Sequence, residues 1–204
     1  MAGPTLTTVR LAKCAERINA KYDNYTLLDV GCRTRDLEPL LKGCKAYYGT
    51  DLTPYEGVLQ CDLEKELPFE DGAFDIITAM DVLEHLDKPH RALDELFRVA
   101  KKAVFISLPN MFYIQFRWNF LIGKGISGKY TFHKHPVIDR HRWILSYQES
   151  IDFIEANANG RTVDHEMVLP TRGRTKRIAE PTQECLANIW PNLFAYGVLF
   201  EITL

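Results

Sequence analysis

The sequence has no apolar run long enough to cross a membrane, and Met1 to Thr5 lack the basic-then-apolar layout of a secretory signal. These absences favour a cytoplasmic protein without a membrane span. Its five cysteines are odd in number and contain no C-x-x-C pair, so we expect reduced thiols rather than a disulfide framework. Neither sign of charge dominates, with 25 lysines and arginines against 27 acids, so we expect no nucleic-acid partner.

The length of the chain limits its organisation. At 204 residues and 46% hydrophobic content, it can bury one sizeable core but not two. We therefore expect residues 1–204 to form a single domain.

A stretch near the N-terminus has the pattern of a ligand-binding strand–turn–helix–strand unit. An apolar run ends at Gly31, a helical pattern with Leu37, Leu40 and Leu41 follows, and a second apolar run ends at Asp51. In a strand–turn–helix–strand unit, such a glycine lets a ligand approach the backbone, and an acid about 20 residues later can bind the hydroxyls of a ribose. The pattern predicts a nucleoside ligand.

Further motifs follow this unit in order along the chain. They are Leu28 to Cys32, Gly49 to Asp51, Cys61 to Leu63, Leu67 to Asp75, Asp81 to Leu86, Ala92 to Val99 and Ser107 to Asn110. Together they resemble the class I S-adenosylmethionine (SAM)-dependent methyltransferases, within the methyltransferase type 11 or MetW-like group. The resemblance covers about half of the chain, from Leu27 to Asn110.

The resemblance implies a fold, a cofactor and a set of binding residues. The fold is α/β, a Rossmann-like three-layer α/β/α sandwich around a mostly parallel seven-stranded sheet, and the cofactor is SAM. Gly31 would face the methionine part of the cofactor, Asp51 the ribose, Asp62 the adenine and Asp81 the donor edge. The full expected set is Asp29, Gly31, Asp51, Leu52, Asp62, Leu63 and Asp81. Asp62 could instead cap the following turn.

The first loop departs from the family pattern. The family has Gly-x-Gly-x-Gly there, whereas this chain keeps Gly31 and has Arg33 and Arg35 at the other two positions. Two long cations must turn outward or they crowd the pocket.

The run from Asp81 to His85 leaves three roles open. Its side chains could be structural or face the cofactor, His85 could be a general base, or Asp81, Glu84 and His85 could contribute to a divalent-metal site. A fourth ligand is not identifiable, and we expect no metal.

The segment at about 111–145 is predicted to be a substrate-side insert. Residues 111–122 are apolar almost all round, which indicates a buried helix, a partner or homodimer surface, or a segment lying on lipid; burial is favoured. A glycine-punctuated loop and a basic, aromatic stretch follow. We expect a lid that closes over an acceptor carrying carboxylate or phosphate, with His133 or His135 as the base, although a solvated loop is the alternative.

The remaining patterns complete the fold. Residues 7–24 suit an amphipathic helix, and Ser146 with Glu149 forms a capping box at the start of another. The interval from Asp51 to Asp62 has room only for a turn before a short strand at 58–60. Residues 162–169 and 196–204 are predicted to be the last two strands, paired antiparallel.

These patterns predict a methyltransferase that transfers a methyl group from SAM to an oxygen or nitrogen of a small-molecule or glycan acceptor. The alternative is a non-catalytic subunit of the same fold that regulates a partner enzyme, with Arg33 and Arg35 marking decay of the donor pocket.

Overall fold

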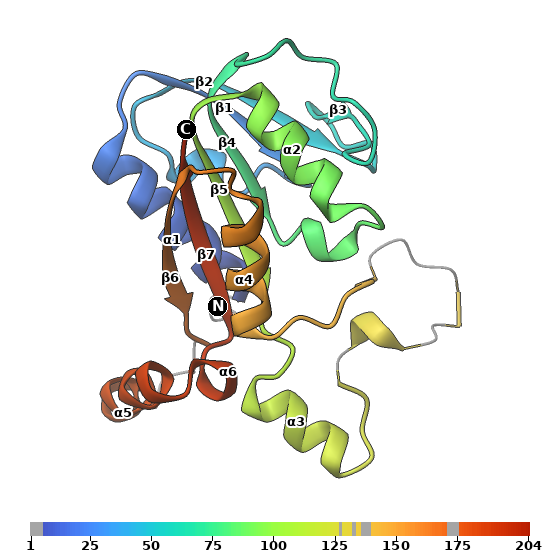
Figure 1. Ribbon diagram of the computed structural model, residues 1–204, viewed down its shortest axis with the longest axis vertical. Coiled ribbons are helices and arrows are strands. Elements are labelled where there is room, and N and C mark those ends of the chain that lie inside the picture. Colours follow the sequence, from blue (N-terminus) through green and yellow to red (C-terminus); the bar gives the residue numbers. More distant parts are fainter. Residues whose placement is uncertain (1–5, 127, 132–133, 136–139, 171–175) are drawn as a thin grey trace.

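The computed structural model describes residues 6–126, 128–131, 134–135, 140–170 and 176–204. A seven-stranded sheet runs through its centre in the order β3-β2-β1-β4-β5-β7-β6 (Figure 1). The strands are β1 Tyr25–Val30, β2 Cys44–Asp51, β3 Leu59–Gln60, β4 Phe74–Met80, β5 Ala100–Pro109, β6 Thr162–Val168 and β7 Gly197–Thr203. The pairs from β3 to β5 are parallel, and β7 is antiparallel to both β5 and β6. The predicted fold class and the antiparallel final pair are confirmed.

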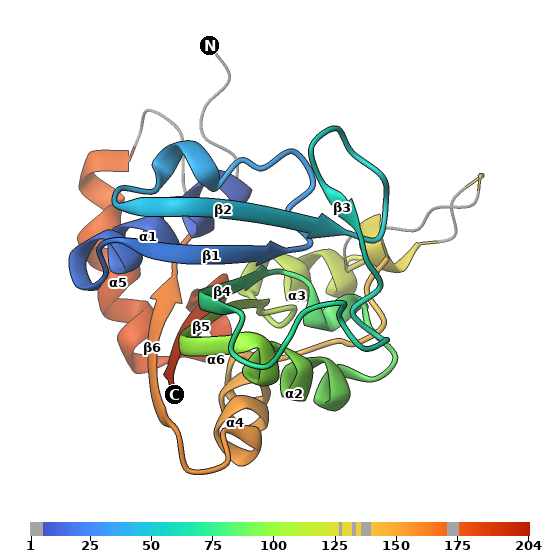
Figure 2. The ribbon, with the colours of Figure 1, turned by 90° about the horizontal axis from the view of Figure 1, so that it is seen from above.

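Helices cover both faces of the sheet. The α-helices are α1 Leu6–Lys21, α2 Pro89–Val99, α3 Ile114–Leu121, α4 Tyr147–Asn157, α5 Lys176–Ile189 and α6 Pro191–Phe194; short 3-10 helices span Glu38–Leu40, Leu83–His85 and Gly128–Tyr130. α2 and α4 pack their apolar residues on one face, whereas α1 packs Cys14 and Ile18 on the other. Figure 2 shows these layers from above. No helix in the described ranges is long and apolar enough to span a bilayer.

The capping box predicted for α4 is present. The Ser146 hydroxyl accepts from the Glu149 N–H, and the Glu149 carboxylate accepts from the Ser146 N–H at 2.8 Å. Two N–H groups at the start of the helix are thereby satisfied.

The helix predicted after the first strand is wrong. Only the 3-10 helix Glu38–Leu40 forms there, because Arg33 and Arg35 adopt φ values of 48° and 59° that an α-helix does not allow. The interval between β2 and β3 holds a turn, as its length predicted.

The burial favoured for residues 111–122 is confirmed at Met111 and Tyr113 but is wrong for α3. Trp118, Phe120 and Leu121 on α3 expose 59%, 69% and 74% of their surface, and α3 has no buried residue. Figure 1 shows why, because α3 projects away from the sheet beyond the end of β5. The segment has no second layer to pack against.

Candidate functional site

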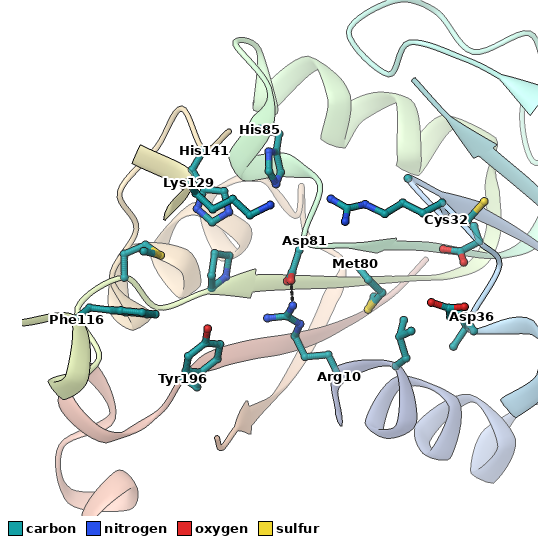
Figure 3. A pocket seen from close by; sticks show the side chains of 17 residues that line it. Arg10, Cys32, Asp36, Met80, Asp81, His85, Phe116, Lys129, His141 and Tyr196 are labelled. Atoms are coloured by element: carbon teal, nitrogen blue, oxygen red, sulfur yellow. Dashed lines mark ion pairs between the residues drawn. The ribbon is translucent and has the colours of Figure 1, made fainter. Parts of the chain in front are cut away.

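Two adjoining pockets lie where the parallel strands end. One has a volume of about 400 Å³ and lies beside α1; we call it the α1 pocket (Figure 3). The other has a volume of about 330 Å³ and lies beside the loops that follow β2 and β3; we call it the β2 pocket. Gly31, Arg33, Asp81 and His85 line both. The carboxyl ends of parallel strands are where open α/β sheets bind ligands.

All seven residues expected to contact the cofactor line one pocket or the other. Asp29 lines the α1 pocket, Gly31 and Asp81 line both, and Asp51, Leu52, Asp62 and Leu63 line the β2 pocket. The fold therefore brings together residues spread over more than 50 positions of the chain.

The first loop keeps the backbone conformation that glycine favours. Gly31 has a φ of 74°, and a Cβ added there would lie 2.5 Å from Cγ2 of Val82. Arg33 and Arg35 also have positive φ, although L residues rarely adopt it. The two arginines therefore occupy backbone conformations that favour glycine.

The two arginines of this loop lie differently. The Arg35 guanidinium turns outward, donating to Glu38 at 3.0 and 2.9 Å and to the Gly57 carbonyl at 2.8 Å. Arg33 stays at the wall between the pockets. Only one of the two cations thus borders the cavity.

Asp51 holds two loops at the mouth of the β2 pocket. One carboxylate oxygen accepts from the Arg33 N–H at 3.1 Å, and the other accepts from the Thr53 N–H at 2.8 Å. A carboxylate oxygen has two lone pairs, so each oxygen keeps acceptor capacity for a ligand hydroxyl.

Asp62 forms the turn cap that was one of the two roles its sequence position left open. One carboxylate oxygen accepts from the Glu64 N–H at 3.0 Å, which is the turn cap, and the other lies 3.4 Å from the Lys65 ammonium. The residue also lines the β2 pocket.

Asp29 is buried under the first loop. Its carboxylate accepts from the Tyr47 hydroxyl at 2.5 Å and from the Thr78 hydroxyl at 2.7 Å. Burial nevertheless dominates and raises the pKa of Asp29 to about 6.

We expect Asp29 to make stability fall as pH rises through the window between its unfolded and folded pKa values. The folded state binds the Asp29 proton more tightly than the unfolded state does, so the contribution of this residue is fully present below pH 3.8 and is lost by about pH 6. The loss is about 3 kcal/mol. Urea unfolding at pH 4 and pH 7 checks it: Asp29→Asn, which does not titrate, should gain this amount relative to wild type at the higher pH. An equal difference at both pH values would contradict it.

Asp81 is held in place by two groups. Its φ is 57°, one carboxylate oxygen accepts from the Ser107 hydroxyl at 2.7 Å, and the other pairs with the Arg10 guanidinium of α1. Burial raises the pKa of Asp81, while Arg10 opposes the shift. Figure 3 shows this ion pair in the α1 pocket.

A segment from the insert docks beside the 3-10 helix after β4. The Arg142 N–H donates to the Glu84 carbonyl at 2.9 Å, and the Trp143 indole N–H donates to the Leu86 carbonyl at 2.7 Å. Nδ1 of His85 lies 2.8 Å from the Arg140 carbonyl oxygen. This docking brings His141 to His85, with ring centroids 4.7 Å apart.

The three predicted catalytic histidines have different positions. His85 lines both pockets, and His135 is exposed and lines neither. His133 lies outside the described residues. Among the α1-pocket residues that sequence reasoning did not select are Arg10, Lys129 and His141.

Residues 28–108 match a family model described as a methyltransferase domain. No curated protein matches the chain in sequence.

Solved structures share the fold at low sequence identity. A SAM-dependent methyltransferase from Archaeoglobus fulgidus is 20% identical with a TM-score of 0.58, over 95% of this chain and 93% of that one. A SAM-dependent methyltransferase from Thermotoga maritima is 16% identical with a TM-score of 0.59, over 97% and 91%. The structure of the Haloferax volcanii Trm112 methyltransferase activator in complex with a methyltransferase matches at 18% identity and a TM-score of 0.58, over 95% and 88%.

Proposed function

Because this chain is a class I SAM-dependent methyltransferase, we propose that it methylates an oxygen or nitrogen of a small-molecule or glycan acceptor held in the α1 pocket. The observation that carries the proposal is the shared wall of the two pockets, formed by Gly31, Arg33, Asp81 and His85. A donor spanning that wall presents its reactive group to the α1 pocket. Holding two reactants in line supplies much of the catalysis in such a reaction.

The described residues fit the SAM cofactor. Asp51 keeps lone pairs for the ribose hydroxyls, and Asp62 and Leu63 lie in the same pocket, where the adenine would bind. Gly31 leaves room against Val82 that a side chain would fill. We propose that Asp29, Leu52 and Asp81 complete the cofactor site.

SAM supplies a methyl group on a positively charged sulfur. In the transfer, the carbon–sulfur bond breaks with its electrons staying on sulfur, the acceptor atom bonds to the methyl carbon, and an O–H acceptor loses its proton. We propose that the loss of this proton is assisted at the side of the α1 pocket where the His85 imidazole lies. Because Nδ1 of His85 donates to a carbonyl oxygen, Nε2 carries the lone pair in the neutral ring. Such a lone pair can accept the proton itself, or it can bind a cation that lowers the pKa of the acceptor hydroxyl.

The α1 pocket suits an anionic acceptor with an apolar part. Arg33 and Lys129 bring positive charge to it, since the charge of Arg10 is paired with Asp81, and Met111, Phe116 and Tyr196 bring apolar surface. We propose that the insert at about 111–145 acts as the lid over this acceptor, because it supplies Met111, Phe116, Lys129 and His141 to the wall.

We also propose a cytoplasmic location for the protein, because its five cysteines are free thiols.

We propose that the exposed apolar surface of α3 contacts a second copy of the chain or another protein. Large exposed apolar patches mark interaction sites, and Trp118, Phe120 and Leu121 form one here. Leu121→Glu should shift a self-associating protein toward monomer in sedimentation velocity, without lowering its melting temperature. If wild type and Leu121→Glu both sediment as monomers, contact with a second copy of the chain is contradicted.

A methyl-release screen over glycans, small acids and amines tests the proposed function, with Asp51→Ala as the background. Turnover of one acceptor by the wild type alone supports it. SAM binding without turnover of any acceptor, together with stimulation of a partner enzyme, would favour the regulatory subunit instead.

A further inference from the structure

Glu84 is a buried carboxylate without a hydrogen bond. It exposes 1% of its surface, and neither of its carboxylate oxygens has a hydrogen-bond partner among the described residues. A buried charge without partners costs several kcal/mol, so such groups are usually paired or bound to metal ions. The side chain therefore points to a missing partner.

Two imidazoles face the same carboxylate oxygen. Oε1 of Glu84 lies 3.9 Å from Nε2 of His85 and 3.8 Å from Nε2 of His141. One ligand atom from each of the three residues lies within 4.8 Å of the others. A tetrahedral ion with bonds of about 2.1 Å needs ligand atoms about 3.4 Å apart. The two carboxylate–imidazole distances exceed that spacing by only 0.4 to 0.5 Å, and side-chain rotation of the two imidazoles toward each other would complete the site.

We propose that Glu84, His85 and His141 bind one divalent transition-metal ion at the wall of the α1 pocket. Two imidazoles and one carboxylate suit Mn²⁺, Fe²⁺, Co²⁺ or Zn²⁺ better than Mg²⁺ or Ca²⁺, which prefer oxygen ligands. Since the part of the chain that the structure describes supplies three protein ligands, positions remain for ligands from the pocket. The sequence suggested Asp81 as a ligand, but its carboxylate instead pairs with Arg10 and accepts a hydrogen bond from Ser107.

The surroundings hold the ligands as metal sites usually do. Nδ1 of His85 donates to the Arg140 carbonyl at 2.8 Å, which directs Nε2 toward Glu84. The bonds from Arg142 and Trp143 to the segment after β4 hold the chain after His141, and the bond to the Arg140 carbonyl holds it before His141. The site is therefore assembled by the same docking that closes the insert on the core.

This inference rests on the proposed function and narrows it to a hydroxyl acceptor. His85 and His141 both line the α1 pocket, so an ion between them meets an acceptor bound there. A bound divalent ion lowers the pKa of a coordinated hydroxyl. The acceptor proton then leaves to solvent through the pocket mouth, and the oxygen bonds to the methyl carbon as the carbon–sulfur bond breaks. His85 serves as a ligand rather than as the base.

Titration of the full chain with Mn²⁺, followed by calorimetry, tests the site without any turnover. We expect one ion per chain, with affinity lowered at least about 10-fold in Glu84→Gln and in His141→Gln. His90→Gln, an exposed histidine that lines neither pocket, should bind Mn²⁺ as the wild type does. Mn²⁺ should also raise the melting temperature of the wild type but not of Glu84→Gln.

The metal inference can fail separately from the proposed function. Absence of Mn²⁺ and Zn²⁺ binding at millimolar concentration would overturn it, as would equal affinity in wild type and Glu84→Gln; Lys129 would then be the charge that balances Glu84. SAM titrated into the same samples reads out the donor site, which Glu84 does not line. If SAM does not bind to wild type, the proposed function fails whatever the metal result.

Discussion

Asp51→Ala is expected to lower the affinity for SAM about 100-fold while the protein stays folded. The carboxylate lies in the β2 pocket with acceptor capacity left on both oxygens after its bonds to Arg33 and Thr53. Each charge-assisted bond to a ribose hydroxyl contributes about 1.5 kcal/mol, so two lost bonds give about 3 kcal/mol, or two powers of ten. Calorimetric titration measures this directly.

Matched variants distinguish loss of the contact between Asp51 and SAM from a general disturbance of the loops that Asp51 holds. Glu56→Ala removes an exposed acid from the same loop, outside both pockets, and should bind SAM as the wild type does. Asp51→Asn keeps an acceptor oxygen and should fall between wild type and Asp51→Ala. Equal affinity in wild type and Asp51→Ala would contradict the ribose assignment.

Asn110→Ala is expected to destabilise the fold by about 3 to 4 kcal/mol. The side chain is fully buried at the end of β5; its amide donates to the carbonyls of Ala195 at 2.7 Å and Asn192 at 3.1 Å, and its oxygen accepts from the Phe112 N–H at 3.0 Å. Truncation leaves these backbone groups without a partner, at about 1 kcal/mol or more each. The melting temperature should drop by about 10 °C.

Two further variants test this explanation. Asn110→Asp keeps the acceptor for Phe112 but turns a buried charge toward the carbonyls, so it should be at least as destabilising as Asn110→Ala. Asn192→Ala removes a half-buried side chain that accepts from the Gln148 N–H, and its effect should stay within about 1 kcal/mol. Comparable melting temperatures for Asn110→Ala and wild type would contradict the proposed anchoring.

The elements that the sequence predicted well are those with strong local patterns. Four β-rich runs became β1, β2, β4 and β5, and the capping box at Ser146 formed as predicted. The helix after β1 failed because its leucine spacing was helical while the backbone at Arg33 and Arg35 is left-handed. That conformation is a tertiary property of the loop, and periodicity does not report it.

The site residues also fall into those that local motifs predicted and those that only the folded structure shows. Motif order brought the seven cofactor candidates to one sheet edge, because each lies at or just beyond the carboxyl end of a strand. His141 and Arg10 were missed because their partners, Glu84 and Asp81, lie 57 and 71 positions away along the chain. The only signal was the concentration of histidines in the insert, which does not say which one reaches the core. The apolar run at 111–122 was assigned to the core because composition does not distinguish burial from a partner surface.

A crystal structure with S-adenosylhomocysteine, the demethylated cofactor, would locate the donor in the two pockets. We expect the ribose hydroxyls on the Asp51 carboxylate and the sulfur at the wall formed by Gly31 and Asp81, facing the α1 pocket. A structure in which the Arg33 side chain fills that wall and excludes the nucleoside from the β2 pocket would contradict it.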